Sequence, residues 1–144
     1  MKLTVREVQA QDAEALAELS GQLGYASTTD ELHQRIEALM KGDDHCVFVA
    51  LDAEKVIGWT HGFYALRLES EPFVEIGGLV VDSAYRKKGI GKLLLEKIDR
   101  WTKTKQCHDV RVRCNILRKE SHLFYERLGF VEQKVQKIFR KKLA

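Results

Sequence analysis

A short segment between residues 85 and 98, YRKKGIGKLLLEKI, places positive charge and glycine at the start of an apolar helix. The first turn of a helix has unpaired N–H groups and the positive end of the helix dipole, so cations there are unfavourable unless an anion binds. Glycine amides and lysine side chains together suit phosphate oxygens. The segment therefore predicts an anion site, and its cations and glycines are Arg86, Lys87, Lys88, Lys92, Gly89 and Gly91.

The spacing in this segment excludes two common phosphate loops. A Walker A loop, G-x-x-x-x-G-K-[ST], would need a glycine at Arg86 and a hydroxyl at Leu93. The dinucleotide fingerprint G-x-G-x-x-G would need a glycine at Leu94. What remains is R-x-x-G-x-G after an apolar strand, a pattern in which backbone N–H groups approach a ligand closely. The local sequence leaves a solvated basic loop open as the alternative.

The cysteines and histidines do not indicate a catalytic or metal site. The three cysteines form no C-x-x-C pair, which indicates a reducing compartment, and we expect a cytoplasmic protein. Cys107 and His108 are adjacent in sequence, a spacing that seldom lets the two side chains meet, so a buried apolar role is favoured for the cysteines. No histidine has metal-ligand spacing, and we expect no metal; the five are His33, His45, His61, His108 and His122.

Apolar periodicity predicts the elements that position the glycine segment. Strands are expected at residues 2–8, 46–51, 56–66, 73–81, 110–114 and, with imperfect alternation, 130–143. Residues 52–55 are expected to join the second and third of these strands as a hairpin. Helices are expected at residues 12–23, after a capping box of Thr28 and Glu31, after Gly91, and at residues 120–128. This order predicts an α+β protein in which helices pack on the faces of one mixed sheet.

Length and composition limit the class of protein. A chain of 144 residues, with 44% hydrophobic and 31% charged residues, fits one soluble domain spanning residues 1–144. No stretch approaches the ~20 apolar residues of a membrane span, and no signal peptide precedes the first charges, so no membrane partner is expected. The formal charge of +3 is too small to indicate a nucleic-acid binder, and aromatics are not interleaved with the basic residues.

Two longer segments resemble signatures of the GNAT family of N-acetyltransferases. FVEIGGLVVDSAYRKKGIGKLLLEKI resembles the acetyl-coenzyme A (acetyl-CoA) binding motif, and NILRKESHLFYERLGF, residues 115–130, resembles the second signature. They occur in the family order. LGYASTTDEL and VQKIFRKKL resemble bacterial members of the small-amine and aminoglycoside type. The resemblance implies the GNAT fold, a mixed central sheet splayed after its fourth strand with about four flanking helices.

The resemblance also implies how acetyl-CoA binds as cosubstrate. The loop at residues 87–92 would cradle the pyrophosphate, the strand near Leu79 would pair with the pantetheine arm, and Gly77-Gly78 would form a bulge that opens a slot. Asn115 would contact the arm, and Arg118, which replaces a common family asparagine, would reach a phosphate. The expected cofactor-binding residues are Leu79, Val80, Val81, Arg86, Lys87, Lys88, Gly89, Ile90, Gly91, Lys92, Asn115 and Arg118.

Two residues are candidates for proton transfer. Glu75 is the one acid within residues 73–81, and it matches the catalytic glutamate of one branch of the family, so it is predicted to be the general base, directly or through water. A solvent-facing or lysine-paired glutamate is the alternative. Tyr125 matches the family tyrosine that protonates the departing thiolate, and its alternative is a core aromatic beside Phe124.

The function that follows is transfer of acetyl from acetyl-CoA to a primary amine of a small molecule, by direct attack in a ternary complex. Residues 21–30 and 132–137 would line the acceptor side by analogy with the family, in which homodimers are common. Two alternatives stay open: an amine on a protein or peptide as acceptor, and a catalytically idle acyl-CoA-binding domain that serves as a sensor.

Overall fold

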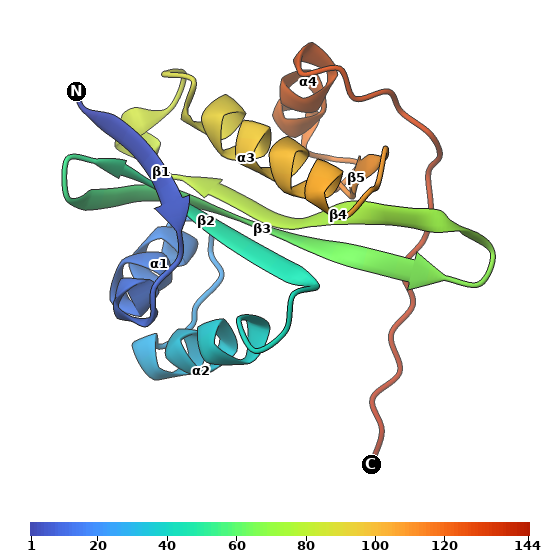
Figure 1. Cartoon of the computed structure of the whole chain (residues 1–144), viewed down its shortest axis with the longest axis horizontal. Helices are drawn as coiled ribbons and strands as arrows, with labels where there is room; N and C mark the ends of the chain where they lie inside the picture. Colours follow the sequence, from blue (N-terminus) through green and yellow to red (C-terminus); the bar gives the residue numbers. More distant parts are fainter. The chain divides into compact units, whose positions relative to one another are not determined.

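The computed structural model describes residues 1–144 and consists of two compact units, Met1–Val112 and Arg113–Ala144. The first unit contains every strand and most helices, and the second contains one helix (Figure 1). In chain order the elements are β1 (Leu3–Glu7), the 3-10 turn η1 (Ala10–Asp12), α1 (Ala13–Gly21), α2 (Thr29–Leu39), β2 (His45–Asp52), β3 (Lys55–Arg67), β4 (Ser70–Val81), the 3-10 turn η2 (Ser83–Tyr85), α3 (Ile90–Thr104), β5 (Val110–Val112) and α4 (Lys119–Arg127).

The first unit is built on one five-stranded sheet with the order β1-β2-β3-β4-β5. Neighbouring strands are antiparallel except β4 and β5, which are parallel and joined through α3. The predicted hairpin at residues 52–55 joins β2 to β3 and contains Ala53 with a φ of 54°. The sheet is therefore mixed, as the alternation of strands and helices predicts.

Helices cover both faces of this sheet, with α1 and α2 on one side and α3 on the other (Figure 1). The buried core under α1 and α2 contains Val8, Ala13, Leu16, Ile36, Val47, Val49 and Leu51. The core under α3 contains Ala50, Ile57, Ile90 and Leu94. Successive residues of a strand point to opposite faces, so Val49 and Ala50 enter different cores. Because almost all of these side chains are hydrophobic, their burial supplies the main driving force for assembling the layers.

Local sequence explains where α2 and α3 begin and which side of α3 is buried. The predicted capping box is present: Thr28 Oγ1 accepts from Glu31 N, and Glu31 Oε1 accepts from Thr28 N, each at 3.1 Å. In α3, the apolar spacing of Leu94, Ile98 and Trp101 predicts the inner side of the helix; Leu94 and Ile98 are buried and Trp101 is half-buried. Thr102, next to Trp101, is buried as well. Thr102 is tolerated there because its hydroxyl donates to the Ile98 carbonyl oxygen at 2.7 Å.

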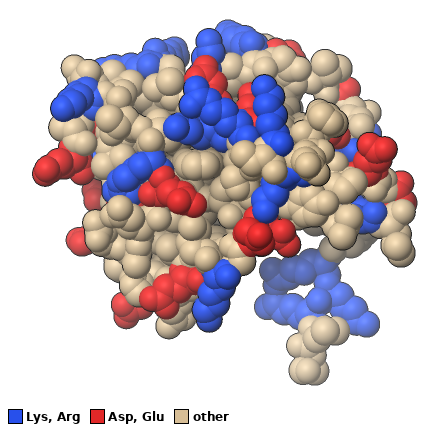
Figure 2. All heavy atoms as spheres, in the orientation of Figure 1, with Lys and Arg blue, Asp and Glu red and all other residues tan.

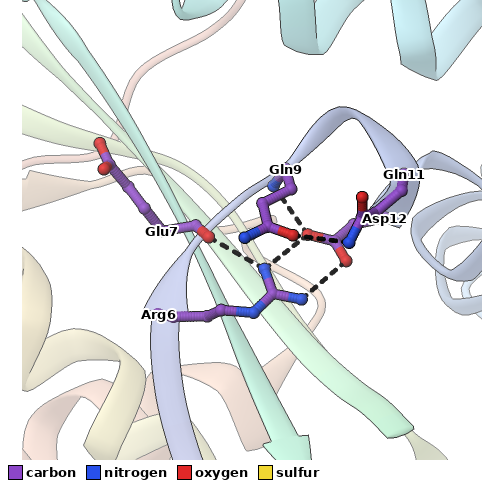
Figure 3. A network of polar contacts seen from close by, with 5 residues as sticks. All are labelled: Arg6, Glu7, Gln9, Gln11 and Asp12. Atoms are coloured by element: carbon purple, nitrogen blue, oxygen red, sulfur yellow. Dashed lines mark hydrogen bonds and ion pairs between the residues drawn. The ribbon is translucent and has the colours of Figure 1, made fainter. Parts of the chain in front are cut away.

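A partly buried ion pair connects β1 to the turn before α1 (Figure 3). The guanidinium of Arg6 forms two hydrogen bonds to the Asp12 carboxylate, at 2.8 and 3.0 Å, and Gln9 N donates to the same carboxylate at 2.7 Å. Burial acts to raise the pKa of Asp12, but the hydrogen bonds and charge of Arg6 and the Gln9 amide outweigh it, so this pKa lies below its ordinary value.

We expect Arg6→Ala to lower the free energy of unfolding by about 2–3 kcal/mol, because it leaves a buried carboxylate without its partner. Since the pKa of Asp12 is lowered by folding, the pair stabilises the protein fully above about pH 4 and stops doing so as the pH falls below that value. Urea unfolding at pH 7 and pH 3 measures both effects. Arg35→Ala, which breaks an exposed pair with Glu31, is the matched control and should cost about 0.5 kcal/mol or less.

The predicted strand at residues 130–143 is wrong in this structure. No helix or strand follows α4, and residues 131–144 are all exposed. A strand needs a neighbour for its backbone hydrogen bonds, and the main chain of these residues donates to no acceptor within the protein. The apolar alternation here is also broken by Lys134, Lys137 and the final run of basic residues.

Candidate active site

The loop between β4 and α3 has an unusual backbone. Asp82 Oδ1 accepts from Ala84 N, and Tyr85 Oη donates to Asp52 Oδ2, both at 2.9 Å, so η2 is held against the end of β2. Beyond it, Lys87 and Gly89 have positive φ angles of 62° and 78°. A left-handed lysine costs roughly 1–2 kcal/mol. Where residues with ordinary and left-handed backbone angles alternate, successive N–H groups point into one concavity. Such a concavity binds anions.

The amides of this loop are unpaired. No main-chain N–H group from Lys87 to Lys92 donates to an acceptor within the protein, and the first bond of α3 is Leu93 N to Gly89 O at 3.1 Å. Gly89 is the N-cap of α3 and provides no capping side chain. These groups therefore remain available to a ligand at the positive end of the helix dipole.

The cations of the segment border the same amides. Arg86, Lys87, Lys88 and Lys92 are all exposed. Only Lys88 has a ring contact, with its Nζ 5.6 Å from the centre of the Tyr85 ring. The loop thus has both properties that the sequence predicts for a diphosphate site, unpaired amides and exposed cations.

The second feature is a bulge in β4. The register pairs His61 with Gly78 but Gly62 with Ile76, so Gly77 is an extra residue. Both bulge glycines lack room for a side chain: a Cβ on Gly77 would lie 2.9 Å from His61 Nδ1, and a Cβ on Gly78 would lie 2.8 Å from Cη2 of Trp59. This agrees with the bulge predicted at Gly77-Gly78.

The backbone of β4 beyond the bulge is open on one edge. Asp82 N donates to Ile57 O at 2.8 Å, and bonded pairs alternate along an antiparallel ladder. Counting back from Asp82, the N–H groups of Val81 and Leu79 therefore point away from β3. On that edge the ladder with β5 has already ended at Ile76. These two residues can therefore pair with an extended ligand arm.

A buried hydroxyl fixes the peptide group at the bulge. Thr60 is fully buried, and its Oγ1 donates to the Gly78 carbonyl oxygen at 2.8 Å. In a trans peptide the N–H points opposite to the C=O, so this bond directs the N–H of Leu79 towards the open edge. Local sequence did not single out Thr60, because its role depends on the pairing of two strands.

Glu75 lies on β4, two residues before the bulge. It is opposite Phe63 on β3 and beside Arg111 on β5, and it is half-buried. Because directly paired residues point to the same face, Glu75 projects to the face of the sheet that also carries Phe63 and Gly77. A carboxylate beside the bulge is where the sequence predicts the general base.

In the second unit, Tyr125 is on α4 among aromatic rings. The centres of Phe124 and Phe130 lie 5.0 and 5.3 Å from the centre of its ring, in edge-on geometry. Burial raises the pKa of Tyr125 to about 12, with a smaller contribution from the Cys114 thiol that the positive charge of Arg118 opposes. The phenol therefore keeps its proton throughout the physiological pH range.

Asn115 and Arg118 shape the turn that leads into α4. Asn115 Oδ1 accepts from Leu117 N at 2.9 Å, and its carbonyl oxygen accepts from Arg118 N at 3.0 Å and from His122 Nε2 at 2.9 Å. Arg118 is the N-cap residue of α4, and both residues are exposed. The Asn115 side chain thus has a structural role here, and its predicted contact with the cofactor stays a prediction.

Other classes of site find no support in the structure. No group of three or more His, Cys, Asp or Glu side chains is arranged to hold a metal ion. None of the helices combines the length and apolar composition needed to span a bilayer.

A sequence model described as Acetyltransferase (GNAT) family matches residues 13–130. The chain belongs to this family. Membership confirms the fold class predicted from the two motifs, including the splay of the sheet after β4, and it confirms the enzyme class, an acetyl-CoA-dependent N-acetyltransferase that acts on an amine. It favours the transferase over the catalytically idle sensor domain.

Similar GNAT proteins act on amino sugars. The chain is 26% identical to an aminoglycoside N(6')-acetyltransferase type 1 of Stenotrophomonas maltophilia, covering 95% of this chain and 92% of that protein. It is 28% identical to a glucosamine 6-phosphate N-acetyltransferase of Arabidopsis thaliana, covering 92% of each. Among solved structures, AAC(6')-Iy bound to the bisubstrate analogue CoA-S-monomethyl-acetylneamine has a TM-score of 0.87 and 22% identity, covering 99% of this chain and 100% of that one.

Proposed function

We propose that the protein transfers acetyl from acetyl-CoA to a primary amine of a small polycationic acceptor, by direct attack in a ternary complex. The observation that carries this proposal is the loop at residues 87–92, whose amides have no acceptor within the protein and whose neighbours are exposed cations. The diphosphate of the cosubstrate would occupy the loop, and the arm would run along β4 from Val81 towards Leu79, where N–H groups face an open edge.

This path would bring the thioester to the bulge of β4. The N–H of Leu79, directed by the hydrogen bond from Thr60 to the Gly78 carbonyl oxygen, would then stabilise the oxyanion that forms on attack. Glu75, two residues before Gly77, would take a proton from the incoming ammonium group. An amine with a pKa near 10.4 is almost entirely protonated at pH 7, and making it neutral costs roughly 4–5 kcal/mol.

Tyr125 would donate a hydrogen bond to the departing thiolate. Since the pKa of Tyr125 is about 12 and that of a thiol is about 8.5, full proton transfer from the phenol would be uphill by about 3.5 pKa units, or ~5 kcal/mol. This is a larger gap than the ordinary phenol pKa suggests. Stabilisation of the thiolate by a persistent phenol hydrogen bond is therefore the role we assign.

Tyr125→Phe should lower kcat about 10-fold, because one hydrogen bond to a charged sulfur is worth roughly 1.5 kcal/mol, and it should leave acetyl-CoA affinity unchanged. Because its pKa is raised, wild-type activity should show no loss from tyrosine ionisation up to about pH 10. Steady-state kinetics with thiol detection measure both. The control is Tyr64→Phe, on β3. Full activity of Tyr125→Phe would mean that Tyr125 has only a packing role.

The charge of α1, α2 and their flanking loops favours a cationic acceptor over a sugar phosphate. Residues 13–44 contain only Arg35 and Lys41 as strong bases, against seven acids. The acids are Glu14, Glu18, Asp30, Glu31, Glu37, Asp43 and Asp44. This segment includes residues 21–30, proposed to line the acceptor side. A negative potential there raises the local concentration of a polyamine-like substrate and lowers that of a phosphate ester.

A panel assay tests the proposed function. Thiol release from acetyl-CoA is followed with aminoglycosides, polyamines, glucosamine 6-phosphate, amino acids and lysine peptides. We expect the highest kcat/KM with polycationic aminoglycosides. Preference for glucosamine 6-phosphate or for peptides would contradict the acceptor class, and absence of thiol release with every amine would contradict the proposed transferase function.

We also propose a homodimer built through the C-terminal segment. Figure 2 shows lysine and arginine side chains gathered along this segment, and apolar side chains lie between them. Val131, Val135, Ile138, Phe139 and Leu143 are between 67% and 89% exposed, which is unusual for residues of this type. A second copy of the chain would cover them and provide the backbone partner that residues 131–144 lack. Sedimentation of the full chain, compared with a chain ending at Phe130, tests this.

Two further parts of the proposal concern organisation and location. Residues 1–144 form one acetyltransferase domain, because the family match at residues 13–130 runs across the boundary at residue 112. The protein works in the cytoplasm, a location favoured by its three free cysteines, Cys46, Cys107 and Cys114.

A further inference from the structure

Two histidines form a hydrogen-bonded pair on the sheet face covered by α1 and α2. His45 Nδ1 lies 2.9 Å from His61 Nε2, and the ring centres are 5.2 Å apart with an angle of 24° between the ring planes. The ring of Phe63 packs against both, at 5.8 Å from each. A hydrogen bond between two imidazole nitrogens requires that one carries the hydrogen and the other a lone pair. Either nitrogen can be the donor, depending on the tautomers of the two rings, so this hydrogen bond can carry a proton from one ring to the other.

The free nitrogen of this pair faces the bulge. With Nε2 of His61 bonded to His45, its Nδ1 lies over Gly77, where a Cβ would be only 2.9 Å away. Gly77 itself is exposed, and His61 beneath it is half-buried. Glu75 lies on the same face, opposite Phe63. His61 is therefore next to the position that the proposed path of the cosubstrate arm gives to the thioester.

The other end of the pair leads to the surface. His45 is the first residue of β2 and is half-buried, and it directly follows the exposed residues 41–44. Tyr64 N donates to the Asp44 carbonyl oxygen at 2.8 Å, which anchors this loop beside the pair. The hydrogen bond between the two imidazoles thus connects a ring beside the bulge with a ring at the start of β2, next to the exposed residues 41–44.

We propose that His61 and His45 are a proton relay that carries the second amine proton from the reaction centre to solvent. This inference rests on the proposed function. The amine nitrogen forms a bond to the acetyl carbon, and the C=O electron pair moves to oxygen. The N–H bond breaks, and its proton goes to His61 Nδ1 while the proton on His61 Nε2 passes to His45 Nδ1. The proton on His45 Nε2 leaves to water, the C=O bond re-forms, and the C–S bond breaks with its electrons on sulfur.

A relay suits this pair better than a single base would. Burial, together with the neighbouring His45, lowers the pKa of His61 to about 4, so its charged form is unfavourable. In a relay one proton arrives as another leaves, and neither imidazole has to hold a charge. After one transfer, each ring has changed to its other neutral tautomer. Proton exchange with solvent restores the starting tautomers. Glu75 removes the first proton from the ammonium group, so the two assignments concern different protons.

The variants His61→Gln and His45→Asn test the relay. The glutamine amide reaches the place of Nε2 and the asparagine amide the place of Nδ1, so each can keep the hydrogen bond between the two positions while ending proton transfer. We expect each to lower kcat about 100-fold with little change in acetyl-CoA affinity, measured by calorimetry, which also reports folding. The double variant should be no slower than either single variant, because all three interrupt one path. Added imidazole should partly restore His61→Ala.

The controls separate the relay from the proposed function. His108→Gln, at an exposed histidine, should keep the wild-type rate. If the wild type releases thiol but His45→Asn keeps its full rate, or if the two losses multiply in the double variant, the relay is overturned and the transferase stands. If the wild type releases no thiol with any amine, the proposed function fails and the relay fails with it.

Discussion

Lys87→Glu/Lys88→Glu should weaken acetyl-CoA binding about 100-fold, equivalent to ~2.7 kcal/mol at 25 °C. Both side chains are exposed beside six main-chain N–H groups without acceptors, so reversing their charges places repulsion where the diphosphate would bind. An exposed charge pair near 4 Å contributes about 1–4 kcal/mol, depending on the effective dielectric, which supports an effect of this size. Isothermal titration calorimetry with acetyl-CoA measures it.

Salt and a charge-matched variant check that the effect is local. Lys41→Glu/Lys103→Glu makes the same change in net charge at two exposed positions outside the loop, and its affinity should stay within a few-fold of the wild type. Because exposed charges are screened, the difference between the loop variant and the wild type should shrink as ionic strength rises from 0.01 to 0.3 M. Equal affinities at low salt would show that the loop does not bind the diphosphate.

Most of the fold follows from patterns within single segments. The capping box at Thr28 and Glu31 predicts the start of α2, and the apolar spacing that begins with Leu94 and Ile98 predicts the buried side of α3. Gly42-Asp43-Asp44 marks the gap before β2. These signals depend on neighbours within one or two turns of the chain, so they can be recognised without knowledge of the tertiary structure.

The segment at residues 130–143 shows where such patterns fail. Its β-branched and aromatic residues favour a strand, but a strand forms only where another main chain completes its hydrogen bonds. Whether a partner exists is a property of the whole assembly. In this structure the segment has none, and its apolar side chains remain exposed.

The residues of the candidate site also differ in whether local sequence can predict them. The glycines and cations of residues 86–92 are contiguous, so the motif predicted the loop that the structure shows with unpaired amides. Thr60 and the histidine pair depend on strand register instead, because His45 and His61 are sixteen residues apart and meet only across the β2–β3 hairpin. A register counted from the predicted hairpin at residues 52–55 is the signal that could have brought the two histidines together.

Glu75→Gln should lower kcat about 100-fold at pH 7 without changing acetyl-CoA affinity, because it removes the proposed base and keeps the size of the side chain. Glu75 projects beside the bulge on the face that also carries His61, where an incoming amine would meet the thioester. The matched control is Glu71→Gln, at an exposed position of the same strand, and its kcat should equal that of the wild type. Thiol assays with both acetyl-CoA and the amine at saturating concentrations give kcat.

The pH dependence of this defect distinguishes Glu75 from the histidine relay. If Glu75 removes the ammonium proton, the Glu75→Gln substitution slows the reaction only while the acceptor amine is protonated. The fraction of neutral amine rises tenfold per pH unit below a pKa near 10.4, so the gap between Glu75→Gln and the wild type should narrow steadily from pH 7 to pH 9.5. His45→Asn acts on a later proton, carried by nitrogen after attack, and its defect should persist at high pH. A Glu75→Gln defect that stays constant with pH would mean that the carboxylate positions the acceptor rather than deprotonating it.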